Sequence, residues 1–123
     1  MKEKRQFVRL DLNVKVDWKR ISQTSEPAAE FTDRTKNISA GGLCLVVNEK
    51  LDVGEEMQIA LELPSRQMIN AIGIVRWINE YEIFGREHEK IYDVGVEFVN
   101  INKKEREEIN KFVFASFGPE KKQ

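Results

Sequence analysis

Two short motifs near the start of the chain carry side chains suited to binding an anionic ligand. The first holds Arg5 and Arg9, whose guanidinium groups are planar, permanently charged forks that match phosphate oxygens or the O6 and N7 acceptors of guanine. The second, Asn37-Ile38-Ser39-Ala40-Gly41-Gly42, puts an amide, a hydroxyl and two glycines on one turn. Glycine lets a backbone come close to a ligand and donate its N–H groups. Together the motifs predict a site for a guanine nucleotide.

The order and spacing of these residues resemble the signature of the PilZ family, RxxxR followed by (D/N)xSxxG. Each signature position is matched in this chain, by Arg5, Arg9, Asn37, Ser39 and Gly42. Segments 71–77 and 92–98 are also similar to later strands of the family, so the resemblance covers about residues 4–117. Either motif alone is common, whereas both in this order are specific.

The resemblance implies a receptor for the bacterial second messenger cyclic di-GMP that needs no cofactor. The implied ligand-binding residues are Arg5 and Arg9 as a clamp and Asn37, Ser39 and Gly42 as a platform, with smaller contributions from Lys4 and Gly41. Lys4 stands where many members of the family have a further arginine. The sequence is therefore compatible with either one bound nucleotide or a stacked pair.

Length, charge and cysteine content limit the classes of protein that this chain can belong to. The 123 residues suffice for one compact domain, and the formal net charge of −1 does not favour general DNA or RNA binding. Residues 1–20 nevertheless hold seven basic and three acidic side chains, a local surplus that suits an anionic ligand. A single cysteine, the absence of a signal peptide and the absence of a long apolar run predict a cytoplasmic protein that does not enter the membrane.

Alternating apolar and polar residues predict several short strands. Val14, Val16 and Trp18 alternate with Lys15 and Asp17, a period of two that is typical of a strand with one buried face. The expected strands cover residues 12–18, 31–37, 43–48, 57–63, 67–78 and 94–99. This pattern favours a barrel or a sandwich, and the resemblance to PilZ selects a six-stranded antiparallel β-barrel with a C-terminal α-helix.

The segments between these strands carry their own signals. Residues 22–30 are expected to form an exposed loop and residues 64–66 a tight turn, while residues 79–90 are expected to form a charged connection around Gly85. Asn102 is a suitable N-cap for a helix over residues 103–117.

The expected organisation has three parts. A flexible arginine-bearing segment over residues 1–11 precedes the barrel and helix of residues 12–117, and a loose tail covers residues 118–123. Binding of the nucleotide is expected to order residues 1–11, and an unidentified downstream protein would recognise that change.

Several residues of the chain have simpler structural explanations. Ser39 is not expected to be a catalytic nucleophile, because the single histidine, His88, lies far away in a charged loop, and no enzymatic activity or metal site is predicted. Trp18 and Trp77 are expected to pack in the core or at the barrel rim, and Cys44 to be a small buried hydrophobe.

Two other functions stay open from the sequence. One is a PilZ-like protein-interaction module that does not bind nucleotide. The other is a small barrel for single-stranded nucleic acid, which would need exposed aromatic and basic residues interleaved on its strands.

Overall fold

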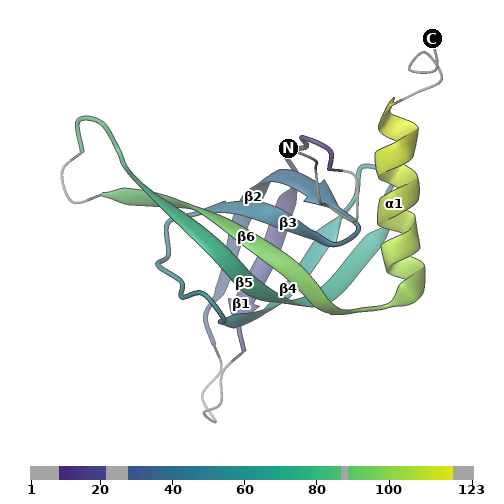
Figure 1. The fold of residues 1–123 in the computed structure, drawn as a ribbon, viewed down its shortest axis with the longest axis horizontal. Helices are drawn as coiled ribbons and strands as arrows, with labels where there is room; N and C mark the ends of the chain where they lie inside the picture. The colour runs from purple at the N-terminus through teal and green to yellow at the C-terminus, as the bar shows by residue number, and fades with distance from the viewer. Residues whose placement is uncertain (1–8, 22–27, 87–88, 118–123) are drawn as a thin grey trace, which may run out of the picture.

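The computed structural model describes residues 9–21, 28–86 and 89–117. Within these residues, six antiparallel strands close a barrel in the order β1-β2-β3-β6-β5-β4, and a helix follows (Figure 1). The elements are β1 (Lys15–Arg20), β2 (Glu30–Ser39), β3 (Gly42–Val47), β4 (Glu56–Glu62), β5 (Met68–Glu82), β6 (Lys90–Ile101) and α1 (Lys103–Phe117). The predicted six-stranded barrel with a C-terminal helix is confirmed.

Some predictions concern residues that the structure does not describe. Lys4 and Arg5 of the first motif belong to this group, as do most of the loop at 22–30, His88 and the tail at 118–123. The expected roles of these residues therefore stay predictions.

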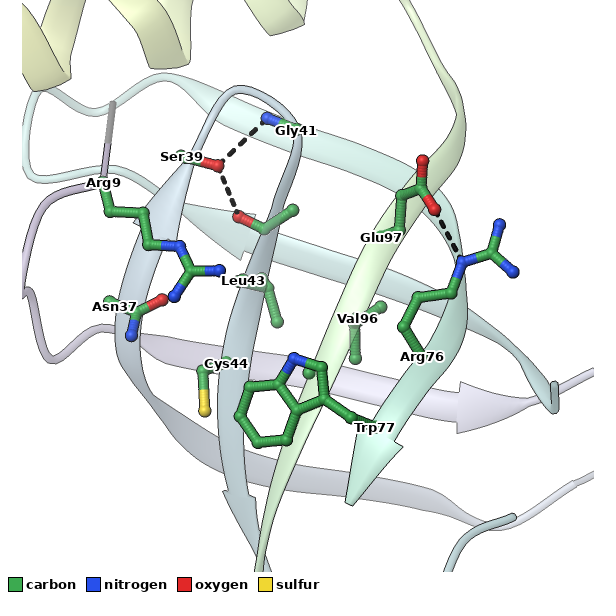
Figure 2. Close-up of a pocket in the computed structure, with 12 residues that line it drawn as sticks. Arg9, Asn37, Ser39, Gly41, Leu43, Cys44, Arg76, Trp77, Val96 and Glu97 are labelled. Carbon is green, nitrogen blue, oxygen red and sulfur yellow. Dashed lines mark hydrogen bonds and ion pairs between the residues drawn. The ribbon is translucent and has the colours of Figure 1, made fainter. Parts of the chain in front are cut away.

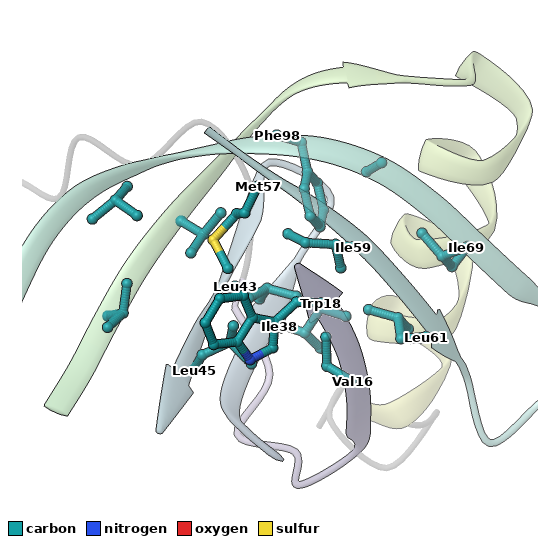
Figure 3. Packing of buried hydrophobic residues seen from close by; sticks show 14 of the residues in the cluster. Val16, Trp18, Ile38, Leu43, Leu45, Met57, Ile59, Leu61, Ile69 and Phe98 are labelled. Atoms are coloured by element: carbon teal, nitrogen blue, oxygen red, sulfur yellow. The ribbon is translucent and has the colours of Figure 1, made fainter. Parts of the chain in front are cut away.

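The core forms because alternate residues of the strands point into the barrel. In β1, Val16 and Trp18 are buried while Lys15 faces solvent. The Trp18 ring stacks on Phe31 with centroids 4.6 Å apart, and its Nε1 donates a hydrogen bond of 2.9 Å to Asp33. Each such buried apolar side chain contributes roughly 1.5–3 kcal/mol. The predicted core position of Trp18 is confirmed (Figure 3).

Three strand irregularities change which residues face outward. The register shifts between Thr35 and Asn37, between Ile72 and Gly73, and between Val75 and Trp77. The second of these shifts lies at Gly73, within β5. A β-bulge inserts one residue into a strand and re-aims its neighbours. The bulges at positions 36 and 76 therefore turn the next side chain, Asn37 or Trp77, toward the outside of the barrel.

The β5–β6 hairpin corrects one prediction. Residues 79–90 do not form a long connection, because β5 continues to Glu82 and β6 begins at Lys90. Lys90 Nζ donates to Glu80 at 2.8 Å across the two strands, and the hairpin extends beyond the rest of the barrel (Figure 1). Both faces of this extension meet water, so its residues lack the alternation by which the other strands were predicted.

Helix α1 begins and packs as the sequence predicts. Asn102 Oδ1 accepts a hydrogen bond of 2.8 Å from the Lys104 N–H, which is the expected N-cap. Ile109 and Val113, four residues apart, are fully buried against the barrel. No described helix has the length and apolar character needed to cross a bilayer.

The packing of α1 can be tested with two substitutions on the same helix. Ile109→Ala should lower the free energy of unfolding by about 2–5 kcal/mol, because a fully buried side chain is removed from the core. Phe114 is 54% exposed, so Phe114→Ala should cost about 0.5 kcal/mol or less. Urea titration followed by circular dichroism measures both. Equal losses would mean that α1 does not pack on the barrel through Ile109.

Candidate functional site

Most of the predicted site residues meet in one pocket of about 300 Å³ on the outer face of the barrel (Figure 2). The pocket is lined by Arg9, Asn37, Ser39, Gly41, Gly42, Leu43, Cys44, Arg76, Trp77, Gly95, Val96 and Glu97. The structure thus places Arg9 of the first motif beside residues 37–42 of the second motif. Arg5 and Lys4 lie outside the described residues.

Four neighbouring strands supply the pocket through their outward positions. Asn37 of β2 pairs with Cys44 of β3, which pairs in turn with Gly95 of β6, and Gly95 pairs with Trp77 of β5. The bulges before Asn37 and Trp77 put both side chains on the outer face. The site therefore depends on one row of cross-strand neighbours.

Arg9 is held in place by the residue that follows it. Leu10 forms an isolated β-bridge with Ile38, in which each backbone N–H donates to the other residue's carbonyl at 2.9 Å. Ile38 lies between Asn37 and Ser39, so Arg9 enters the pocket directly beside the second motif (Figure 2). An exposed guanidinium in this position can reach an anion in the pocket.

Ser39 organises the turn that joins β2 and β3. Its Oγ accepts a hydrogen bond of 3.1 Å from the Gly41 N–H and donates one of 3.4 Å to the Gly42 carbonyl. The Phe98 N–H donates to the Gly41 carbonyl at 2.9 Å, which ties the turn to β6. Ser39 therefore has a structural role, and a Ser39→Ala variant would change the turn as well as any ligand contact.

Gly42 is required by close packing between strands. A Cβ at this position would overlap the backbone carbonyl oxygen of Val96. Among the described glycines, positive φ occurs at Gly54 and Gly85, so the turn does not need the left-handed conformation that glycine tolerates. The absence of a side chain at Gly42 also leaves the pocket floor flat.

Trp77 forms a wall of the pocket. Its ring lies across Gly95, where a Cβ would overlap ring atoms Cε2 and Nε1. The residue is 38% exposed, so of the two positions expected for Trp77 it does not take the one in the core, and its ring packs on β6 at the surface of the barrel. An accessible indole face beside a basic side chain is suited to stacking with a nucleobase.

Charged groups of both signs line the pocket. Arg9 and Arg76 are basic and Glu97 is acidic, with Arg76 Nε donating to Glu97 Oε1 at 2.6 Å. These three side chains together give a surplus of one positive charge, which favours an anionic ligand.

Cys44 is buried, as predicted, but it faces the pocket floor. Burial raises the pKa of its thiol above the ordinary value, and the nearby Asp93 carboxylate acts in the same direction. The cations of Lys36 and Arg9 lower that pKa. Lys36 in turn donates to Asp93 at 2.8 Å, which raises the pKa of Lys36. The thiol is therefore protonated and serves as a small floor residue.

A sequence profile of the PilZ domain matches residues 3–115. The chain belongs to the PilZ family. No curated protein gives a significant match.

Solved structures of other proteins share this PilZ fold. The Bacillus subtilis inhibitor of motility, MotI/DgrA, superposes with a TM-score of 0.75 and 22% identity over 94% of this chain and 52% of that chain. The complex of K. pneumonia MrkH with c-di-GMP superposes with a TM-score of 0.74 and 17% identity, over 98% of this chain and 54% of that chain. The PilZ domain of YcgR from Escherichia coli with c-di-GMP superposes with a TM-score of 0.67 and 14% identity. This match covers 92% of this chain and 91% of that chain. The chain thus spans about half the length of the first two proteins.

Seven pocket residues were not predicted as site residues from the sequence, and four of them occupy outward positions of β5 and β6. Arg76 and Trp77 end the PilZ-like segment 71–77, and Gly95 and Glu97 lie within segment 92–98. Both segments were recognised as strands of the family, but their outward positions were not assigned to the site. The bulge at position 76 shifts the alternation of β5, so the pattern of apolar residues alone does not predict which way Trp77 faces.

Two glycine substitutions can show whether backbone or a side chain limits the space at Gly42 and at Gly95. Gly42→Ala should lower the free energy of unfolding by about 1–3 kcal/mol, because the new methyl group meets backbone that cannot move aside. Gly95→Ala should cost less, because the partly exposed Trp77 ring can swing away. Urea titration and tryptophan emission measure both effects, and only Gly95→Ala should red-shift the emission of the folded protein. A folded Gly95→Ala variant with wild-type emission would contradict the position assigned to Trp77.

Proposed function

We propose that this protein is a non-enzymatic receptor that binds cyclic di-GMP in the pocket beside Arg9. The observation that carries the proposal is the meeting of Arg9 with the Asn37–Gly42 turn in one pocket of a PilZ barrel. Three similar structures, of MrkH, the YcgR PilZ domain and YcgR, contain c-di-GMP, which supports the same ligand here.

The pocket offers complementary groups to each part of this ligand. Arg9 and Arg5 would bind phosphate oxygens or the guanine O6 and N7 atoms with charge-assisted hydrogen bonds, aided by Lys4. Asn37 can pair its amide with polar base atoms, while the flat floor at Gly42 admits the sugar-phosphate ring.

Trp77 adds a contact of a different kind. Its indole lies at the β5–β6 side of the same pocket and presents a face on which a guanine ring can stack. Stacking of a base on an aromatic side chain contributes about 1–3 kcal/mol. No covalent step is involved, because the receptor binds its ligand and releases it unchanged.

The bound ligand would act on a partner through the N-terminal segment. The bridge between Leu10 and Ile38 fixes this segment at one point, directly next to Arg9. Contacts from Arg5 to a phosphate would then order residues 5–9 over the pocket and change the surface around Phe7 and Val8. A downstream protein in the cytoplasm would recognise that surface.

Isothermal titration with cyclic di-GMP tests the binding proposal. Arg5→Ala and Arg9→Ala should each weaken binding by about ten- to a hundredfold, since each removes charge-assisted hydrogen bonds. Asn37→Ala should also weaken binding, and it tests the platform more cleanly than Ser39→Ala, because Ser39 holds the turn.

Arg34→Ala serves as the control for charge. Arg34 lies on the outer face of β2 outside the pocket, where it donates to Asn13 at 2.9 Å. This variant should bind the ligand within about twofold of the wild type. Wild-type affinity in both Arg5→Ala and Arg9→Ala would contradict the clamp, and a folded wild type without any binding would favour a protein-interaction module.

Amide hydrogen exchange tests the relay. Addition of cyclic di-GMP should give new protection at residues 5–9 and at 37–42, because the ligand would bridge the two segments. Residues 57–63 should change little, since none of them lines the pocket. Equal protection of residues 5–9 with and without ligand would mean that the segment is ordered beforehand and that the signal takes another route.

A further inference from the structure

Among the described residues that line the pocket, Glu97 is the one carboxylate, and its presence in a proposed anion site calls for an explanation. Glu97 lies on β6, directly across from Gly42 of β3 and Ile74 of β5. We infer that Glu97 selects guanine over other bases by accepting hydrogen bonds from its Watson–Crick edge. This inference rests on the proposed binding of cyclic di-GMP and assigns base recognition at that site.

The floor beside Glu97 has the shape that a flat base requires. It is made by the outward positions Gly42 and Cys44, whose side chains are absent or small, while the Trp77 ring covers the neighbouring Gly95. Trp77 bounds this floor on one side, and Glu97 and Arg76 bound it on another (Figure 2). A guanine stacked against the indole would therefore lie with one edge within the reach of Glu97.

One oxygen of the carboxylate is already paired. Arg76 Nε donates to Glu97 Oε1 at 2.6 Å, so the Glu97 side chain lies toward Arg76 at the rim of the pocket (Figure 2). A carboxylate has about four lone-pair positions, so both oxygens keep the capacity to accept further hydrogen bonds. The Arg76 cation also offsets the repulsion between Glu97 and the phosphates of the ligand.

The stability of the fold does not account for this ion pair. The side chains of Arg76 and Glu97 are 51% and 54% exposed, and exposed ion pairs contribute about 0.2–1 kcal/mol. Neither residue belongs to the hydrophobic core. A role in ligand recognition explains why the pair lies at the rim of the pocket.

The chemistry of the bases makes Glu97 selective. Guanine presents two adjacent donors, N1–H and the 2-amino group, which match the two acceptor oxygens of a carboxylate. Adenine presents an acceptor at N1, so its lone pair would face the carboxylate and oppose binding. Hypoxanthine keeps N1–H but lacks the 2-amino donor, so it isolates one of the two hydrogen bonds.

A comparison of two ligands with two variants tests the inference. Isothermal titration would measure cyclic di-GMP and cyclic di-IMP, whose bases lack the 2-amino group, against the wild type and Glu97→Ala. The wild type should bind cyclic di-GMP about tenfold or more tightly than cyclic di-IMP. In Glu97→Ala, the ratio of the two dissociation constants should fall by about tenfold. Glu82→Ala, an exposed residue of β5 outside the pocket, should keep the wild-type preference.

The outcomes separate this inference from the proposed function. If the wild type binds cyclic di-GMP and Glu97→Ala keeps the full preference over cyclic di-IMP, the role of Glu97 is refuted while the receptor function stands. A proportional loss for both ligands would also refute it, because Glu97 would then act only by positioning Arg76. If the folded wild type binds neither ligand, the proposed function fails and this inference fails with it. Circular dichroism of each variant confirms that the barrel is folded.

Discussion

The close approach of β3 to β6 at Gly42 is the constraint on which both the barrel and its pocket depend. The Val96 carbonyl occupies the space that a side chain at Gly42 would need. This approach closes the barrel, because β3 pairs with β6 and joins the β1–β2–β3 strands to β5 and β4. The same contact produces the flat floor of the pocket. The pairing of β3 with β6 and the shape of the pocket floor therefore both depend on the absence of a side chain at Gly42.

The β-bulges in β2 and β5 also determine which side chains face the pocket. A regular β2 would alternate without interruption and could not hold Thr35 in the core while Asn37 faces outward next to Cys44. The extra residue at position 36 resolves that conflict, and Lys36 uses its outward position to pair with Asp93. In this barrel, the irregular positions rather than the regular ones bring the polar groups together.

The sequence predicts the regular parts of this protein well and the irregular parts poorly. Trp18 and Ile109 follow the periods of a strand and a helix, so their burial could be expected from the pattern alone. Trp77 could not be placed in this way, because one bulged residue reverses the direction of every side chain after it. Glu97 was missed for another reason, since its part in the pocket arises from pairing with Gly42 across two strands far apart in the sequence.

The site residues of the two motifs differ in how far they could be predicted. Asn37, Ser39 and Gly42 share one turn, so their proximity follows from local sequence, and Arg9 joins them through the bridge at Leu10. That bridge uses only main-chain atoms, and no side chain is needed to form it. Its partner Ile38 is also fully buried in the core. Arg9 is thus connected to a core residue of the barrel through its neighbour Leu10 and one pair of main-chain hydrogen bonds. A substitution of the Arg9 or Leu10 side chain would leave the main-chain groups of this connection in place.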